Sequence, residues 1–448
     1  MNELLPKLRS NSASHTCKIR KMEQKKYRLG EIADIVNGAT PSTKITDNYD
    51  GSIIWITPKD LSEQKTKWIR RGQRNITEKG FNSCSSQMIP PHNILMSSRA
   101  PIGLLAINEN ECCTNQGFKN LVLDKTICDT DYMYYYLKFH IKEIEALGSG
   151  TTFKEVSKSS LYNFEISLPN LETQRDISKC LSDLDRKIEL NRQINDNLEA
   201  MAKQLYDYWF VQFDFPNGEG KPYKSSGGAM VWNEKLKREI PKGWSVSNVK
   251  SLIEPIERGI PYSSDDLLDP FATPMINLAC FSKAGDYRLG EMKFFSGKVS
   301  NDKLISPMDM LIACTDMTQG ADIIGRPILA SDEYDQYTFS TDLALITPKG
   351  KFKMYMYYTL RTPFYHKYIR PFASGTTVKH LNLIGVENYG LPVPPIETQS
   401  KFEDLITPIK EKQSKILNEI NALTKQRDEL LPLLMNGQAS VNYHLSDD

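Results

Sequence analysis

The sequence predicts a mixed α/β (α+β) protein in which one structural unit occurs twice. Each unit is expected to be a globular domain followed by a long helix. The two helices are expected to pair as an antiparallel coiled coil, which gives the chain a pseudo-twofold internal repeat. Three observations predict this fold: two segments repeat each other, an apolar seam follows each of them, and short apolar runs of strand length precede them.

Length and composition limit the classes of protein. The 448 residues are enough for two or more domains, and 40% hydrophobic residues exclude a disordered chain. The 56 Lys and Arg residues are balanced by 55 Asp and Glu residues, so a protein coated with basic residues is also excluded. No signal peptide or membrane span is visible, and the cysteines form no C-x-x-C pair. We therefore expect a cytoplasmic protein with buried thiols and no metal site.

The internal repeat is the strongest signal in the chain. Residues 149–174 and 374–399 match at an offset of 225 positions, with 10 identities in 26 positions and no gap. Chance would give about one or two identities at ordinary residue frequencies. Both segments begin with S-G-T-T-x-K and end with P-x-x-E-T-Q. A repeat of this size indicates duplicated domains rather than a solenoid.

The repeat and the turn-rich segments divide the chain into parts. Runs such as SIIWI and MLIAC predict strands in two globular regions, and a segment rich in Gly, Pro and Ser separates the two units. The predicted order is an N-terminal extension (1–26), a first globular domain (27–169), a first long helix (170–213), a linker (214–243), a second globular domain (244–394), a second long helix (395–437) and a tail (438–448).

Both predicted helices have apolar residues in alternating steps of four and three, which is the pattern of a coiled-coil seam. Thr173 is the expected N-cap of the first helix. The polar seam residues either tolerate solvent or fix the register of the pair, and the sequence favours neither. The seam residues that we single out are Leu184, Ile188, Asn191, Asn195 and Leu198 in the first helix, and Ile409, Ile416, Ile420, Leu423 and Arg427 in the second.

Catalytic motifs are largely missing from the sequence. No phosphate-binding P-loop, nucleophile elbow or H-E-x-x-H zinc motif occurs. An Asp followed by Glu-x-Lys could hold Mg²⁺ in a nuclease, and Asp50 precedes Glu63 while Asp269 precedes Glu291. These two sets lie at non-equivalent places in the repeat, so a Mg-dependent DNA nuclease is kept only as an alternative. A coiled-coil adaptor that does not bind DNA is the other alternative.

Basic residues gather in local stretches. Between Leu343 and Gly385 there is no Asp or Glu, while seven Lys and Arg residues alternate with tyrosines. This pattern suits contact with phosphates, although a helix with a buried Tyr-rich face would look similar. A weaker basic cluster lies between Lys59 and Arg74. The repeated S-G-T-T-x-K element offers backbone N–H groups, hydroxyls and an amine to a phosphate, or it is an ordinary turn.

At this point the chain resembles the specificity subunits of type I restriction–modification enzymes. The resemblance covers residues 27 to about 437. Each motif is weak alone, but their order around two heptad helices is distinctive. Besides the repeated elements, the motifs are LGEI (29–32), GATPS (38–42), RAPIG (99–103), NQGF (115–118), YDYWFVQFDF (206–215) and IPKGW (240–244). The second copy departs from the pattern, with Cys314-Thr315-Asp316 where the first has Ser97-Ser98-Arg99.

The resemblance implies a non-catalytic subunit of a DNA methyltransferase and endonuclease complex. Each globular domain would be a target recognition domain for one half of an asymmetric, bipartite site in double-stranded DNA. The helices would be conserved spacers, central and distal, that set the gap between the halves. Two methyltransferase subunits with S-adenosylmethionine, and restriction subunits with ATP and Mg²⁺, would assemble on this chain, which would itself hold no cofactor.

The motifs and basic clusters supply the candidate DNA-binding residues. In the first copy they are Thr40, Ser42, Lys59, Arg70, Arg71, Arg99, Gln116, Ser149, Thr151, Thr152 and Lys154. In the second copy they are Arg326, Lys367, Arg370, Ser374, Thr376, Thr377 and Lys379. A seam of about 33 residues would span about 50 Å at 1.5 Å per residue. That length corresponds to about 15 base pairs of B-DNA.

Overall fold

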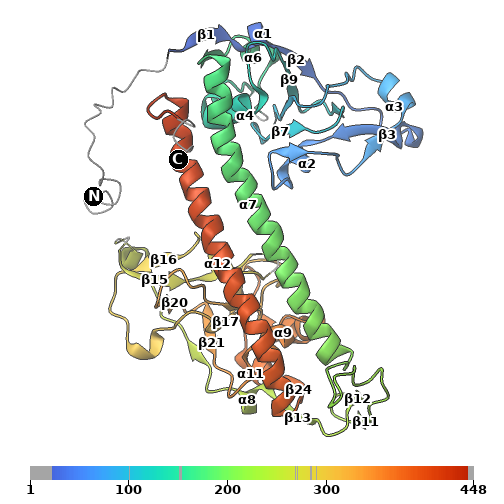
Figure 1. Cartoon of the computed structure of the whole chain (residues 1–448), viewed down its shortest axis with the longest axis vertical. Coiled ribbons are helices and arrows are strands. Elements are labelled where there is room, and N and C mark those ends of the chain that lie inside the picture. The colour runs from blue at the N-terminus through green and yellow to red at the C-terminus, as the bar shows by residue number, and fades with distance from the viewer. Residues whose placement is uncertain are drawn as a thin grey trace. The chain divides into compact units, whose positions relative to one another are not determined.

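The computed structural model describes residues 23–99, 101–150, 154–267, 269, 271–282, 285–288 and 290–441 (Figure 1). The chain divides into two compact units. Unit 1 consists of the described residues up to Lys187 and from Thr424 onward, and unit 2 is Ile188–Leu423. The two long helices, α7 (Leu171–Tyr206) and α12 (Ile396–Met435), contribute to both units.

Unit 1 contains a sheet in the order β2-β9-β6-β7-β4, antiparallel except for the parallel pair β4–β7. A second sheet has the order β5-β3-β8, and β1 pairs with β10. The strands are β1 (Lys25–Arg28), β2 (Ala33–Asn37), β3 (Tyr49–Ile56), β4 (Trp68–Ile69), β5 (Asn75–Ile76), β6 (Ile94–Met96), β7 (Leu105–Asn108), β8 (Cys113–Thr114), β9 (Lys119–Leu123) and β10 (Glu165–Leu168). The helices are α1 (Leu29–Ile32), α2 (Pro58–Ser62), α3 (Glu78–Asn82), α4 (Thr130–Phe139), α5 (Ile141–Ala146) and α6 (Lys158–Tyr162), with a 3₁₀ turn at Thr46–Asn48.

Unit 2 contains sheets in the orders β14-β21-β17-β19, β16-β15-β20 and β18-β23-β22, with the pairs β13–β24 and β11–β12. The strands are β11 (Met230–Asn233), β12 (Arg238–Pro241), β13 (Ser245–Asn248), β14 (Glu257–Arg258), β15 (Thr273–Ile276), β16 (Lys293–Phe295), β17 (Met310–Ala313), β18 (Thr315–Asp316), β19 (Pro327–Leu329), β20 (Thr338–Phe339), β21 (Leu343–Ile346), β22 (Ala373–Ser374), β23 (Lys379–Leu381) and β24 (Gly390–Val393). The helices are α8 (Val249–Leu252), α9 (Lys353–Thr359), α10 (Pro363–Ile369) and α11 (Leu383–Glu387). Short helical turns lie at Asp207–Val211, Ser264–Leu267, Leu278–Cys280, Asn301–Lys303 and Arg370–Phe372.

The internal repeat is visible element by element. Helices α6 and α11, strands β10 and β24, and the first residues of α7 and α12 are each separated by the offset of 225 found in the sequence. The strand pair β1–β10 has its counterpart in β13–β24, and both pairs are antiparallel. The predicted α+β duplication with two long helices is therefore confirmed.

The repeated P-x-x-E-T-Q element has a structural role at the start of each long helix. Gln174 Nε2 donates to the carbonyl of Pro169 at 2.9 Å, and Gln399 Nε2 donates to the carbonyl of Pro394. Both glutamines are buried. The predicted N-cap Thr173 is wrong, because Asn170 precedes the helix and its Oδ1 accepts the Thr173 N–H at 2.9 Å.

The two long helices pair through the predicted seam. In unit 2, Gln413 Nε2 donates to the carbonyl of Asn195 at 3.1 Å, and in unit 1, Arg427 contacts Asp185 at 2.8 Å. In unit 2, Asn195 of α7 meets Gln413 of α12 and Glu199 meets Lys410, so the two helices run antiparallel there. Ile188, Asn191, Ile416 and Leu423 are buried, and Leu184, Asn195, Leu198, Ile409, Ile420 and Arg427 are half-buried. The side chains of Gln413 and Arg427 bond across the pair, which favours a role in register for these two residues, whereas Asn195 takes part only through its backbone carbonyl.

The segment 214–243, expected as a linker, is folded onto unit 2. Phe215 and Ile240 lie in its core with Trp244, and β11 pairs with β12 as a hairpin. The buried Asp214 carboxylate accepts from the backbone N–H of Ser225 at 2.7 Å. The Gly and Ser residues of this segment therefore form tight turns. Its aromatic residues pack the segment against the core of unit 2.

No helix of the described chain is both long and apolar enough to cross a bilayer. The cysteines in the described ranges are free thiols. Burial raises the pKa of Cys112 and of Cys113 to about 12, so both thiols stay protonated near neutral pH, as buried structural thiols should.

Candidate nucleic-acid interface

Two motifs of the first domain form one surface. The Thr40 hydroxyl donates to Oε1 of Gln116, which joins the GATPS and NQGF segments. The backbone beneath them is held by the Ala39 N–H, which donates to the Thr114 carbonyl at 2.9 Å. A Cβ on Gly38 would lie 1.9 Å from the carbonyl oxygen of Asn115, so this approach requires glycine. Gln116 and Ser42 are exposed beside the joined segments.

Arg99 lies next to the first repeated loop. Its Nε contacts Glu155 Oε2 at 2.9 Å, and Lys119 Nζ contacts Glu155 Oε1 at 3.2 Å. Burial opposes ionisation of Glu155, but the two cations outweigh it and lower its pKa. Ser149 and Glu155 exchange backbone hydrogen bonds of 3.0 and 2.9 Å, which closes the loop. Ser149 and Lys154, at the ends of this loop, are exposed near the two cations Arg99 and Lys119.

Thr151 and Thr152 lie outside the described residues, so the tip of the first repeated loop is not part of this geometry.

The basic cluster of the first domain lies among acidic side chains. Lys59, Arg70 and Arg71 are exposed, and Lys59 Nζ is 3.9 Å from Glu63. Arg71 lines a depression of about 610 Å³ together with acidic side chains, including Asp50. The cluster is therefore partly neutralised.

The carboxylates proposed for a nuclease are engaged elsewhere. Asp50 pairs with Arg74 at 3.1 Å, Glu63 accepts from Gln73 at 2.7 Å, and Glu291 pairs with Arg288 at 2.7 Å. Within the described ranges, no cluster of three or more His, Cys, Asp or Glu residues could hold a metal ion. The geometry gives the nuclease alternative no support.

The second repeated loop joins β22 to β23. Gly375 has a φ of 120°, and a Cβ there would lie 2.0 Å from the Val378 carbonyl oxygen, so glycine is required. Lys379 Nζ donates to the Gly375 carbonyl at 2.6 Å, which gives this amine a role in closing the loop. Ser374, Thr376 and Thr377 are exposed on the loop.

A basic depression of about 650 Å³ lies in unit 2. It brings together Arg326, Lys367 and Arg370, of which the last two are exposed. Burial, then the neighbouring Arg361, lowers the pKa of Arg326. Sequence reasoning missed Lys203, because it comes from α7, whereas Arg361 and His366 lie in the basic stretch 343–385 but were not singled out. The basic lining is Lys203, Arg326, Arg361, His366, Lys367 and Arg370.

The tyrosines of the basic stretch belong to the core. Tyr355, Tyr357, Tyr358 and Tyr365 are buried, and Tyr368 is half-buried. For these rings, the alternative of a helix with a buried Tyr-rich face therefore holds. Helix α9 turns its tyrosines inward, so only the basic side chains that flank them remain available to a polyanion.

The second copy replaces the Arg99 position with an acidic residue. Asp316 follows β17 as Arg99 follows β6, and it is buried. Its carboxylate accepts from the backbone N–H groups of Thr318 at 2.7 Å and Ile323 at 2.8 Å. The two domains thus share a scaffold but present different side chains on it.

The fold and the repeated sites define a protein built from two related, non-identical domains. A model of the family described as "Type I restriction modification DNA specificity domain" matches residues 22–200 and again residues 241–426. The chain belongs to this family.

Known proteins agree with this assignment. The chain is 31% identical over 92% of its length to the type I restriction enzyme MjaIX specificity subunit of Methanocaldococcus jannaschii, covering 93% of that protein. It is 22% identical to the MjaVIII specificity subunit of the same organism over 92% of both chains. The crystal structure of a type I restriction–modification S subunit from M. genitalium has the same fold, with a TM-score of 0.60, 17% identity, and coverage of 93% of this chain and 96% of that one.

Proposed function

We propose that this chain is the DNA sequence-recognition subunit of a type I restriction–modification complex and that it binds an asymmetric, bipartite site in double-stranded DNA. The observation that supports this most is the double match of the specificity-domain family to two copies with different surfaces. One copy has Arg99 where the other has the buried Asp316. Two different surfaces on one duplicated scaffold should read two different half-sites.

The proposed interface includes both repeated loops and their basic neighbours. In the first domain it comprises Thr40, Ser42, Lys59, Arg70, Arg71, Arg99, Gln116, Ser149, Thr151, Thr152 and Lys154. In the second it comprises Arg326, Lys367, Arg370, Ser374, Thr376, Thr377 and Lys379. The exposed cations would contact phosphates and set the orientation of each domain, while hydroxyl and amide groups would contact base edges.

We also propose the functional boundaries of the chain. The target recognition domains would be 27–169 and 244–394, and the spacers 170–213 and 395–437. Residues 1–26, 214–243 and 438–448 would be an extension, a connecting segment and a tail.

The partners of the proposed complex are methyltransferase and restriction subunits, and a surface of α7 suits a helical partner. Leu190, Ile194 and Met201 are exposed by 49%, 43% and 59%. Their spacing places them on one face of the helix, away from the seam. We propose that an amphipathic helix of a methyltransferase subunit covers this stripe.

Two methyltransferase subunits would bind S-adenosylmethionine, and restriction subunits would bind ATP and Mg²⁺. This chain would hold no cofactor and perform no chemical step, and the complex would act in the cytoplasm.

The test is coexpression of the full chain with its methyltransferase subunit, followed by purification and mapping of methylated DNA motifs. We expect copurification and one asymmetric motif with two specific halves around an unspecific gap. A symmetric motif would contradict the proposal. Cleavage of DNA by the chain alone with Mg²⁺ would favour the nuclease alternative, and the absence of salt-dependent DNA binding in the complex would favour the adaptor.

A further inference from the structure

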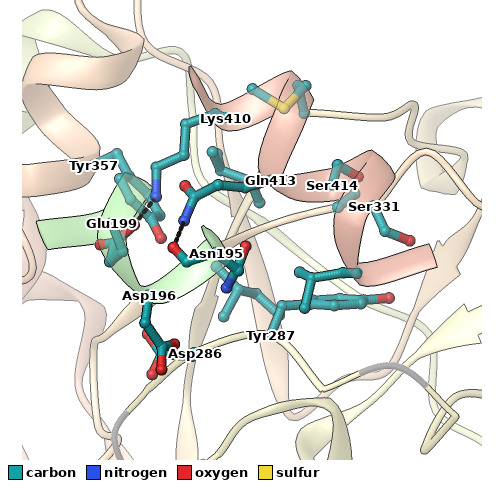
Figure 2. Close-up of a pocket in the computed structure, with 15 residues that line it drawn as sticks. Asn195, Asp196, Glu199, Asp286, Tyr287, Ser331, Tyr357, Lys410, Gln413 and Ser414 are labelled. Carbon is teal, nitrogen blue, oxygen red and sulfur yellow. Dashed lines mark hydrogen bonds and ion pairs between the residues drawn. The ribbon is translucent and has the colours of Figure 1, made fainter. Parts of the chain in front are cut away.

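In each unit an ion pair joins the two long helices near the seam. In unit 1, Asp185 of α7 pairs with Arg427 of α12 at 2.8 Å, and their side chains are only 22% and 16% exposed. In unit 2, Glu199 of α7 pairs with Lys410 of α12, with side chains 27% and 7% exposed. Figure 2 shows the second pair beside the Asn195–Gln413 hydrogen bond. In both pairs the carboxylate lies on α7 and the cation on α12.

The internal repeat allows the charges at equivalent positions of α7 and α12 to be compared. At the offset of 225, Asp185 corresponds to Lys410, so equivalent positions carry opposite charges. Arg427 corresponds to Ala202, and Glu199 lies one helical turn before Ala202. If α7 paired with a second α7 in the same antiparallel register, Asp185 would face Glu199 twice. If α12 paired with a second α12, Lys410 would face Arg427 twice.

In each unit, a tyrosine of the globular domain donates a hydrogen bond to the α7 carboxylate of the ion pair. The sequences around Tyr135 and Tyr358 correspond, since both follow Met-Tyr. Tyr135 OH donates to Asp185 at 2.5 Å, and Tyr358 OH donates to Glu199 at 3.4 Å. In a pair of two α12 helices, Arg427 would take the place of Glu199 near Tyr358. Asp428, which also contacts Arg427 at 2.7 Å, is 55% exposed and would offset that repulsion weakly.

We infer that these four charges select the pairing partner: each long helix of this chain accepts the unlike helix and rejects a second copy of itself. Like charges at half-buried interhelical positions disfavour self-pairing, while opposite charges favour the observed pair. The selected partner is the other repeat of the same chain. The two different domains of one chain therefore share one helix pair. Pairing of a long helix with the same helix of a second chain would instead bring two identical domains together.

Charge exchange in the full chain tests this selection. The variant Asp185→Arg/Arg427→Asp keeps the α7–α12 pair but turns both like-helix contacts into attractive ones. The variant Glu199→Lys/Lys410→Glu does the same through the other pair. The four-residue exchange combines them and restores repulsion between like helices. All variants have the composition and net charge of the wild type, so each is a control for the others.

Each protein is refolded from denaturant at about 20 µM, and its mass is measured by size-exclusion chromatography with light scattering. We expect either two-residue exchange to raise the dimerisation constant by about tenfold or more, and the four-residue exchange to return it to the wild-type value. The increase should shrink in 1 M salt because the charges are screened. Equal self-association in all proteins, or the most self-association in the four-residue exchange, would overturn the inference. If one two-residue variant does not refold, the other makes the same comparison with wild type.

Discussion

At the residue scale, charged side chains in this protein fall into buried pairs and exposed cations, and the two groups have different consequences. Glu199 and Asp185 are held by cations inside their units. Lys367 and Arg370 face solvent beside the basic depression. The first group should therefore affect stability and the second group DNA binding.

Glu199 gives a pH-dependent prediction. Burial opposes its ionisation, but Lys410 and Arg361 outweigh burial and lower its pKa below the usual 4.5. A depressed pKa in the folded state stabilises the protein above the unfolded pKa, and this stabilisation is lost as pH falls through the folded pKa. Glu199→Gln should thus be less stable than wild type at pH 7, with a smaller difference below about pH 4. Urea denaturation at both pH values measures the difference in unfolding free energy between wild type and variant. A difference that does not shrink in acid would contradict a lowered pKa for Glu199.

Lys367 and Arg370 give a prediction for DNA binding. Replacing either with alanine should weaken binding of the complex to all sequences and reduce the slope of log K against log salt by about one unit. Lys235→Ala is the matched control, because this exposed lysine lies on the turn between β11 and β12. Salt titrations of fluorescent DNA measure the slope. A slope that stays at the wild-type value in both variants would remove these residues from the phosphate contacts.

At the element scale, the long helices were predictable because their signal is periodic and long. Heptad steps place apolar residues on one face whatever the surrounding fold, so the seam could be located from sequence. The N-cap of α7 was placed three residues too late, because Asn170 and Thr173 are both good caps and only the geometry separates them. The tyrosines of α9 could not be assigned from the sequence, because alternation of basic and aromatic residues describes a nucleic-acid surface and a half-buried helix equally well.

Helix α12 allows a prediction with adjacent residues. Ile406 is fully buried against unit 2, whereas Leu405 is 49% exposed. Ile406→Ala should lower the free energy of unfolding by about 2–5 kcal/mol, because it leaves a cavity in the core. Leu405→Ala should change it by about 0.5 kcal/mol or less. Chemical denaturation compares the two variants, and equal losses would show that this face of α12 is not packed as described.

The length of the helix pair gives a second prediction at this scale. Under the proposed function, removing one heptad from both α7 and α12 shortens the spacer by about 10 Å. That distance corresponds to about three base pairs. The mapped motif should keep both half-sites with a shorter gap. Retention of the original gap would show that something other than the helices sets it.

At the scale of the whole molecule, the duplication was the feature that the sequence predicted best. Ten identities fixed the offset, and the same offset relates α6 to α11 and β10 to β24. The surfaces could not be predicted in this way. The basic depression combines Lys203 of α7 with residues more than a hundred positions away along the chain. The segment 214–243 was predicted as a linker because its turn residues outnumber its aromatic residues, although those aromatic residues pack into the core.

The central claim is that each globular domain reads its own half of the DNA site. It is tested most directly by replacing residues 27–169 with the corresponding domain of another specificity subunit and mapping the methylated motif of the assembled complex. We expect one half-site to change to that of the donor while the other half-site and the gap stay the same. A change in both half-sites, or in neither, would contradict it.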